Sequence, residues 1–281
     1  AQTQFGTKKL LDGTAGLSAV VTDARRIGGM FFGGSAVGTD SATSTIVREY
    51  ALGSGVITID VTTAAERAVV DGTRAYTGAG AIIQTSGTVV INGVSFSVQA
   101  GTTTLQSFVD QINSQSSVTG VVAEIFENAA NDFRVRLRST EYGANFSVNL
   151  NDQQQILLNG ATSASDDGVN AVARVTLRTI DGGEVYVTFT GGVSRGDSGL
   201  RLTDAKGNVI LLNEAGNDAA IDDAVVGRTT AGQLEFQIGA NAGQVARFSI
   251  NNMRSDKLGT GVVAGKSLAD IDVTKTGGAE E

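Results

Sequence analysis

Alternation of hydrophobic and polar positions is most regular near the C-terminal end of the chain. Two alternating runs lie there on either side of a glycine- and asparagine-rich stretch, residues 239–243. A period of two is typical of a half-buried strand. The pattern therefore predicts a β-hairpin with a loop longer than two residues, here called the core hairpin. One face of it is expected to bury the hydrophobic positions Leu234, Phe236, Ile238, Phe248 and Ile250.

A second patterned unit begins at residue 88 with the sequence TVVINGVSFSV. Asn92-Gly93 separates its two alternating runs, and both residue types tolerate the positive φ angles of a type I′ turn. Downstream, hydrophobic residues recur at 105, 108, 109 and 112. This spacing predicts an amphipathic helix, with Thr103 or Thr104 as its N-cap.

Most of the remaining chain has strand patterning. Alternating runs occur at 17–21, at 56–62, and in two further hairpins at 172–190 and 200–212; after the helix come runs at 121–125, 133–137 and 146–150, the last of which is expected to close the same sheet. Segment 63–70 fits either a short helix or the end of a strand. The patterns predict a mainly β protein with a small α+β part.

Three polar or glycine-rich segments interrupt these runs. Segment 25–38 predicts a loop anchored by Phe31 and Phe32; a phosphate-binding loop is the alternative, but no Gly-Lys-Ser/Thr follows. Segment 39–45 is rich in Ser and Thr, so it is either a solvated loop or a carrier of O-glycans. Segment 161–168 is expected to connect two domains.

Composition excludes several kinds of catalysis. The 281 residues include no Cys and no His. Disulfides, thiolate chemistry and every catalytic arrangement that uses Cys or His are therefore ruled out. An enzyme using only carboxylates, as glycosidases do, is left open, but no paired-acid motif supports it. The prediction is that the chain is not an enzyme and has no catalytic residues.

Charge and hydropathy limit the partners. The formal net charge is −8, which disfavours a nucleic-acid partner because phosphate binding needs a basic surface. No apolar run approaches the ~20 residues that span a membrane. The aspartates do not follow the spacing of a calcium loop, so neither a metal nor a cofactor is expected.

Three arginines form a candidate binding surface. Arg134, Arg136 and Arg138 alternate with the hydrophobic residues of one predicted strand and so share a face. They are interpreted either as an anion or glycan contact, or as a solvated face paired across strands with Glu124 or Glu127.

Two sets of phrases resemble proteins of the bacterial flagellum. FGTKKLLDG at 5–13, FQIGANAGQ at 236–244 and FSINNMRSDKLG at 248–259 resemble the inner core of flagellins, the subunits of the flagellar filament. Independently, about residues 87–148, with INGVSFSV, TLQSFVDQIN and TGVVAEI, resemble a small repeat named after its Ile-Asn dipeptide. That repeat recurs in the variable parts of flagellins and hook-associated proteins.

The flagellin resemblance implies an elongated multi-domain chain of β-hairpins with nested domain insertion. Residues 1–16 and 230–281 would be the remnant of the inner core domain. Residues 17–76 and 163–228 would form a middle β domain. Residues 77–162 would form an outer α+β domain that contains the Ile-Asn repeat. The family's long terminal helices would lie beyond both ends of this sequence, whose first residue is expected to be a cut end.

The same resemblance implies a structural role outside the cell, as the exposed part of the flagellar filament. Its partners would be other flagellin subunits and, through segments outside this sequence, a host innate receptor. Because no heptad-spaced apolar seam is present, the chain itself is expected to be monomeric. The alternative function is a cell-surface binding module that holds a polysaccharide or a host ligand.

Overall fold

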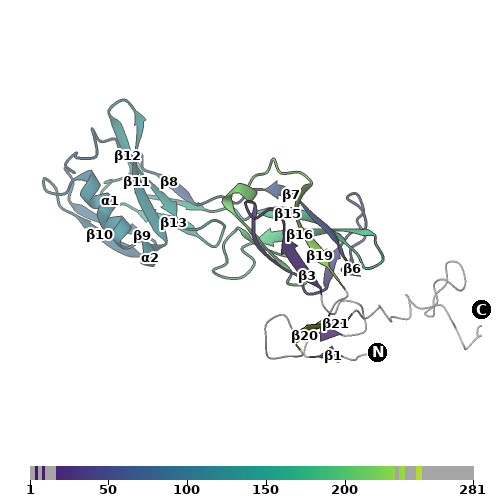
Figure 1. Ribbon diagram of the computed structural model, residues 1–281. Coiled ribbons are helices and arrows are strands. Elements are labelled where there is room, and N and C mark those ends of the chain that lie inside the picture. The colour runs from purple at the N-terminus through teal and green to yellow at the C-terminus, as the bar shows by residue number, and fades with distance from the viewer. Residues whose placement is uncertain (1–3, 6–7, 10–16, 232–233, 238–244, 249–281) are drawn as a thin grey trace, which may run out of the picture.

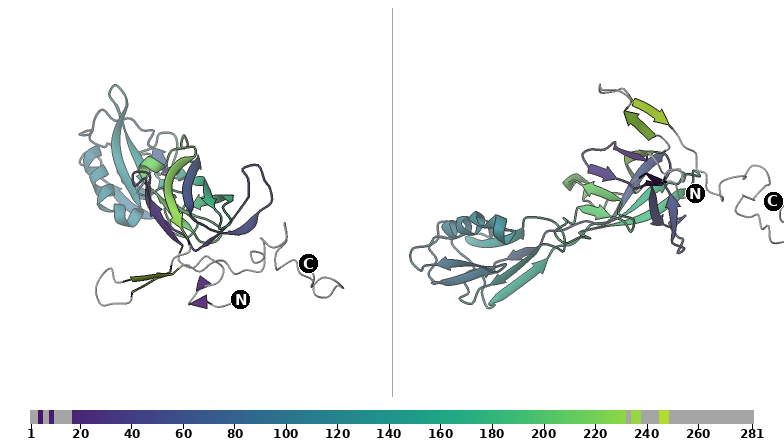
Figure 2. Two further views of the ribbon diagram at one scale, coloured as in Figure 1. Left: turned by 45° about the vertical axis from the view of Figure 1, so that its right-hand side comes forward. Right: turned by 90° about the horizontal axis from the view of Figure 1, so that it is seen from below.

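The computed structural model describes residues 4–5, 8–9, 17–231, 234–237 and 245–248. Figure 1 shows that most of this chain forms two lobes lying end to end, and the views in Figure 2 agree. Each lobe has its own cluster of buried hydrophobic residues. The predicted class, mainly β, elongated and multi-domain, is confirmed.

The eight-stranded lobe is built on one antiparallel sheet. Its strands, in spatial order, are β3 (Ser18–Val21), β19 (Ala224–Thr230), β7 (Gly55–Thr63), β15 (Val172–Arg178), β16 (Glu184–Gly191), β17 (Arg201–Thr203), β18 (Val209–Leu212) and β4 (Ile27–Phe31). A separate hairpin, β5 (Ser35–Gly38) and β6 (Arg48–Ala51), and the short 3-10 helix η1 (Glu214–Gly216) complete the lobe.

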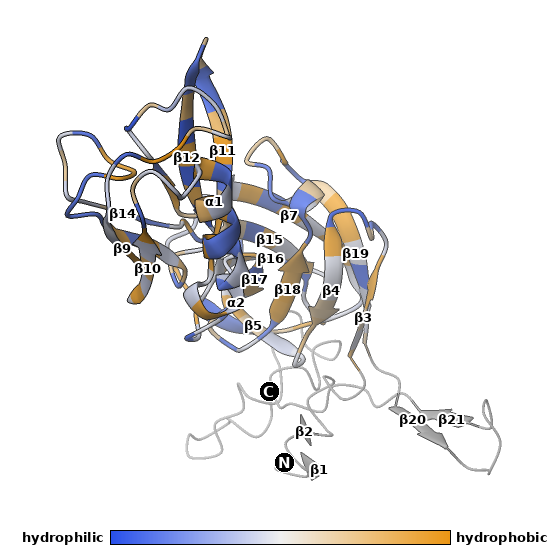
Figure 3. Cartoon of the chain, turned by 90° about the vertical axis from the view of Figure 1, so that its left-hand side faces the viewer, coloured by the Kyte–Doolittle hydropathy of each residue, from blue (hydrophilic) through white to orange (hydrophobic). Residues whose placement is uncertain are grey.

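Alternation along the strands builds the core of this lobe. Every second residue of β15 and β16 is buried, and Figure 3 shows hydrophobic and hydrophilic positions in turn along strands of both lobes. The two edge strands, β3 and β4, are consecutive in the chain and lie close together, so the sheet curls back on itself. Gly227 permits this closure, because a Cβ there would lie 2.7 Å from the Met30 methyl carbon.

The helix-bearing lobe contains two smaller sheets and the described α-helices. One sheet has the order β10 (Val94–Val98), β9 (Gly87–Ile91), β13 (Ser147–Asn151), β14 (Ser163–Asp167), and the other has the order β11 (Val121–Ala129), β12 (Asp132–Ser139), β8 (Val69–Asp71). Helix α1 (Leu105–Ser114) packs on β11 and β10, and α2 (Ser116–Thr119) follows it. The helix-bearing lobe is one continuous stretch of the sequence. The eight-stranded lobe is formed by the segments before and after that stretch, so the helix-bearing lobe is inserted within it.

The predicted hairpin and helix of this lobe are confirmed. Asn92 and Gly93 have φ angles of 47° and 85°, as a type I′ turn requires. Thr104 is the N-cap of α1, and its side chain accepts a hydrogen bond from the Ser107 backbone N–H. The apolar stripe of the helix is buried at all four predicted positions, Leu105, Phe108, Val109 and Ile112.

Two predicted connections are strands instead. Most of the glycine-rich segment 25–38 belongs to β4 and β5, because it pairs through its backbone with β18 and β6 and buries Ile27 and Met30 in the core. Phe32 contacts Phe189 edge-on with ring centroids 6.2 Å apart, while Phe31 points to solvent with 64% exposure. Within 161–168, residues 163–167 form β14, which pairs along β13.

Two further predictions are settled by strand pairing. The run at 146–150 does not close the sheet of β11 and β12; its strand β13 pairs with β9 and β14 in the other sheet. Segment 63–70 is a strand end followed by β8, so the helix alternative is wrong. The hairpins predicted at 172–190 and 200–212 are confirmed as β15–β16 and β17–β18. The proposed domain boundaries remain a prediction.

Candidate functional site

The core hairpin is described only in part. Strands β20 (Leu234–Gln237) and β21 (Val245–Phe248) pair antiparallel, with Leu234 opposite Phe248 and Phe236 opposite Ala246. Near the other end of the chain, β1 (Gln4–Phe5) pairs with β2 (Lys8–Lys9). Ile238 and Ile250 lie outside the described residues. The expected burial of the five hydrophobic positions on one face therefore stays a prediction.

The structure places two of the three candidate arginines in ion pairs. Arg134 donates to both carboxylate oxygens of Asp132, at 2.9 and 2.7 Å. Arg136 donates in the same two-pronged way to Asp71 of β8, at 2.6 and 2.9 Å. Such bidentate contacts fix the orientation of a guanidinium as well as its charge. Hydrogen bonds from the arginines hold the pKa of Asp71 and of Asp132 below their usual values.

Arg136 has two further contacts on the same face. Its guanidinium carbon lies 4.5 Å from the centroid of the Phe126 ring, and Nη1 is 3.8 Å from a Glu124 carboxylate oxygen. Arg138 differs, because its side chain is exposed and no described residue forms a hydrogen bond or ion pair with it. Two of the three positive charges are thus already neutralised, and a glycan contact at this face stays a prediction.

A groove on the sheet of the eight-stranded lobe contains a second cationic pair, which the sequence analysis missed. Its volume is about 580 Å³, and Arg178 of β15 and Arg228 of β19 contribute to its wall. The Arg178 side chain lies against Gly55, where any Cβ would collide with it. Arg178 forms an ion pair with Glu184 at 2.9 Å. Arg228 is exposed, and no described residue contacts its guanidinium through a hydrogen bond or ion pair.

The two lobes meet where the chain crosses between them. Glu66 and Val169 form a β-bridge, with N–H to oxygen distances of 2.9 and 3.0 Å. The loop between β16 and β17 also contacts this crossing, since the Gly199 N–H donates a hydrogen bond to the Tyr142 carbonyl at 2.6 Å. The backbones approach so closely that a Cβ at Gly143, which has a φ of +106°, would lie 2.6 Å from the Gly199 Cα.

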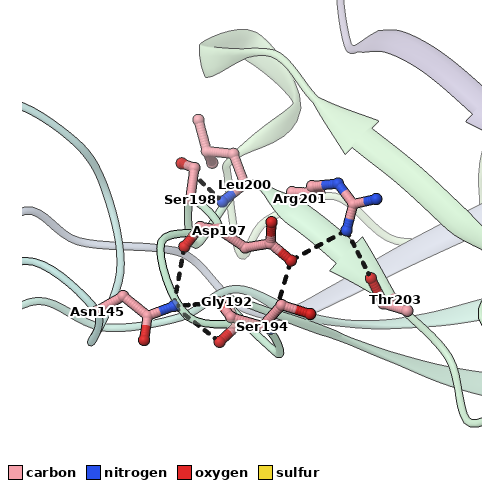
Figure 4. Close-up of polar contacts among 8 residues, drawn as sticks. All are labelled: Asn145, Gly192, Ser194, Asp197, Ser198, Leu200, Arg201 and Thr203. Carbon is pink, nitrogen blue, oxygen red and sulfur yellow. Dashed lines mark hydrogen bonds and ion pairs between the residues drawn. The ribbon is translucent and has the colours of Figure 1, made fainter.

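Asn145 fastens this crossing to a loop of the eight-stranded lobe, as Figure 4 shows. Its Nδ2 lies 3.0 Å from the Gly192 carbonyl, 2.9 Å from that of Ser194 and 3.0 Å from that of Asp197. An amide NH₂ has two hydrogens, so one of them is shared between two carbonyls. The Asp197 carboxylate in turn accepts from Arg201 at 3.0 Å and from the Ser194 N–H at 3.3 Å, which closes the loop.

An aromatic and two charged groups brace the other side of the crossing. The Arg67 guanidinium carbon lies 4.2 Å from the Tyr142 ring centroid, and both residues reach Glu214 of η1. The Tyr142 hydroxyl donates to the Glu214 carboxylate at 3.3 Å. Together with Asn145, these contacts link the crossing to two parts of the eight-stranded lobe, the 192–200 loop and η1. Sequence periodicity contains no information about such side chains, because all of them lie outside the alternating runs.

The Ile-Asn dipeptide has a defined structural part in the helix-bearing lobe. Ile91 is completely buried in its core. The Asn92 side chain donates to the carbonyls of Thr119 and Ser147, at 2.8 and 2.9 Å, and accepts from the Asn149 N–H at 2.8 Å. One turn residue therefore connects the β9–β10 hairpin to the end of α2 and to β13.

Metal-ligand groups and membrane helices were sought in the described residues. No group of three or more Asp or Glu side chains there is arranged to hold a metal ion. No helix in the described ranges is both long and apolar enough to cross a membrane.

Comparison with known proteins identifies only distant structural likenesses. No protein-family model and no curated protein matches the sequence. The D2-D3 domains of the flagellar cap protein FliD from Escherichia coli are 15% identical, with a TM-score of 0.40, and the match covers 78% of this chain and 98% of that one. The D1-D2-D3 domains of the same protein are 17% identical, with a TM-score of 0.43, covering 80% of this chain and 56% of that one. FliD (HAP2) from Pseudomonas aeruginosa PAO1 is 19% identical, with a TM-score of 0.39, covering 70% and 83%.

These values are too low to assign this chain to the family of any of those proteins.

Proposed function

We propose that the chain is the exposed portion of a structural protein of the bacterial flagellum, and specifically of flagellin, the subunit of the filament. The protein would act outside the cell and support motility. Two independent phrase resemblances, one at the ends of the chain and one in its middle, support this role. Their nested order matches the order of the lobes, since the Ile-Asn repeat lies in the continuous lobe.

The observation that carries the proposal is the structure of the Ile-Asn unit. Ile91 fills the core and Asn92 makes three hydrogen bonds to backbone groups of other elements. Both residues of the dipeptide therefore have structural roles here, and the unit has the order hairpin, helix, strand that the resemblance implies.

The proposed partners follow from the same role. Other flagellin subunits would contact the full-length protein through its core, and a host innate receptor would bind segments outside this sequence. Nucleic acid and membranes are not proposed as partners, since the net charge is −8. The chain alone is proposed to be a monomer, because its sequence has no heptad-spaced apolar seam through which helices of different subunits would associate.

Immunoelectron microscopy of intact flagella from the source bacterium tests this proposal. Antibodies raised against residues 17–231 should label the filament along its whole length. Label confined to one point of the flagellum would contradict the filament subunit and identify another flagellar component. Absence of label from flagella, with label elsewhere on the cell, would contradict the flagellar role altogether.

A second candidate function, a surface module that binds an acidic polysaccharide, is favoured by the groove at Arg178 and Arg228. Two guanidinium groups line this groove; Arg178 is paired with Glu184, whereas Arg228 has no partner among the described residues. Carboxylate groups of uronic acids have the planar geometry that arginine binds in a bidentate manner.

Binding of polygalacturonate, measured by calorimetry at low salt, tests this second function. Arg228→Ala should weaken binding severalfold, whereas Arg138→Ala, which removes another exposed arginine from the other lobe, should not. Equal losses in the two variants would show that only overall charge matters. No binding by the unmodified chain would reject the module.

A further inference from the structure

The sequence contains two Asn-Gly pairs, and the hydrogen bonding of their asparagine side chains differs greatly. They are Asn92-Gly93 and Asn159-Gly160. Asn-Gly is the dipeptide in which a side-chain amide is most easily attacked by the next backbone nitrogen, because glycine has no side chain to hinder ring closure. Gly93 and Gly160 both have open space where a Cβ would be, so neither pair is protected by crowding at the glycine.

The Asn92 side chain is held at both of its polar atoms. Nδ2 donates two hydrogen bonds and Oδ1 accepts one, all with backbone partners between 2.8 and 2.9 Å away. Asn92 is also only partly exposed. Turning its amide carbon toward the Gly93 nitrogen would break all three hydrogen bonds and separate the turn from α2 and β13.

The Asn159 side chain is free of such contacts. It is exposed, and no described residue forms a hydrogen bond with its amide group. The backbone on either side is held: the Asn159 N–H donates to the Thr73 hydroxyl at 2.7 Å, and the Gly160 N–H donates to Gln155 Oε1 at 3.2 Å. Only the second, long hydrogen bond restrains the nitrogen that would attack.

We propose that Asn159 is a site of spontaneous deamidation and that Asn92 is protected by the fold. The Gly160 backbone nitrogen loses its proton and attacks the side-chain carbonyl carbon of Asn159. A carbon–nitrogen bond forms and the amide nitrogen leaves as ammonia, which gives a five-membered succinimide. Water then opens the ring at either carbonyl, and the product is aspartate or isoaspartate. The step consumes one water molecule and adds one negative charge between β13 and β14.

The two pairs provide their own matched control in one experiment. The 281-residue chain is incubated in mildly alkaline buffer, once folded and once unfolded in urea, and its peptides are analysed by mass spectrometry with isoaspartate detection. In urea both sites should react at similar rates. In the folded chain Asn159 should react at least about tenfold faster than Asn92, since three hydrogen bonds must break at Asn92 before its amide carbon can reach the Gly93 nitrogen.

An Asn159→Gln variant, whose longer side chain would have to close a six-membered ring that forms much more slowly, should lose the product at 159 and retain the behaviour of Asn92. Comparable rates at the two sites in the folded chain would overturn the proposal, as would a faster reaction at Asn92. Accumulation of the acidic product in the folded Asn159→Gln variant at the unmodified rate would also overturn it, because the site would then lie elsewhere.

Discussion

The two lobes reach similar burial by opposite routes through the sequence. In the helix-bearing lobe, β9 pairs with β10 and β11 pairs with β12 across short turns. In the eight-stranded lobe, β7 pairs with β15 and β19, which follow the whole helix-bearing lobe in the chain. Since closing a long loop costs entropy before its contacts form, the first lobe can fold locally, while the second has to wait for both of its segments.

The largest expected effect tests whether the two cores are independent. Phe108 and Phe189 are each completely buried, one in each lobe. Replacing either by Ala should lower the free energy of unfolding of its own lobe by about 3–5 kcal/mol, because a cavity remains. Amide hydrogen exchange should show lost protection around α1 in Phe108→Ala and around β16 in Phe189→Ala.

The pair of variants serves as mutual control, since the residue type and burial are the same. If Phe108→Ala removed protection from both lobes equally, the lobes would be one cooperative unit and the contrast between local and non-local assembly would have no thermodynamic meaning.

A buried carboxylate should sharpen the comparison within the helix-bearing lobe. Asp152 is completely buried and accepts from the N–H groups of Ile156, Leu157 and Leu158, at 2.6–2.8 Å. Asp152→Ala leaves these donors without an acceptor, which should cost about 2–4 kcal/mol in chemical denaturation of this lobe. The exposed Asp167, replaced by Ala, should cost less than about 0.5 kcal/mol. Similar losses in both variants would mean that this loop is unimportant for stability.

A smaller effect is expected at the crossing between the lobes. Asn145→Ala removes the donor shared by three carbonyls of the 192–200 loop, and the cost should be about 1–2 kcal/mol. Because the β-bridge at Glu66 remains, both lobes should stay folded while hydrogen exchange in the loop accelerates.

The matched variant for Asn145 is Asn149→Ala. The Asn149 side chain makes one local hydrogen bond, to Ser147, so its removal should leave the loop unchanged. Small-angle scattering should show a broader distribution of lobe orientations for Asn145→Ala alone; an unchanged distribution would show that the backbone contacts suffice to fix the lobes.

The smallest effect concerns acid. Arg136 lowers the pKa of Asp71, so this pair stabilises the helix-bearing lobe fully above the unfolded-state pKa of about 3.9 and progressively less as the pH falls through the lower, folded-state pKa. Asp71→Asn should reduce stability at neutral pH by less than about 1 kcal/mol, because the pair is half exposed. The variant and the original chain should converge in stability at the lowest pH; a constant gap across the titration would contradict the ion pair.

Sequence patterns predicted the elements that depend on side-chain periodicity or turn chemistry. Asn92-Gly93 specified its own turn, and the spacing of Leu105 to Ile112 specified α1. The glycine-rich β4 was missed because its order comes from backbone pairing with β18, to which Gly28 and Gly29 contribute no side-chain pattern. β14 was missed for a related reason, since SASDD is polar throughout and is a strand only because β13 provides its hydrogen bonds.

The functional surfaces were less predictable than the strands. The face shared by the three arginines followed from alternation, but the pairing of Arg136 with Asp71 joins residues from β12 and β8, whose adjacency no local pattern reveals. Arg228 and Asn145 depend in the same way on segments distant in sequence. Such groups become visible only when the sheet order is known.

The β-bridge between Glu66 and Val169 also bears on how such a chain can change over generations. The points where the chain leaves and re-enters the eight-stranded lobe are neighbours, so the DNA between these two codons can be exchanged without altering the spacing of the flanking strands. Recombination could replace the helix-bearing lobe by any domain whose ends lie equally close together. The incoming domain would lack the side chains that hold the crossing to the eight-stranded lobe, Asn145 above all. Selection would then have to restore equivalent contacts.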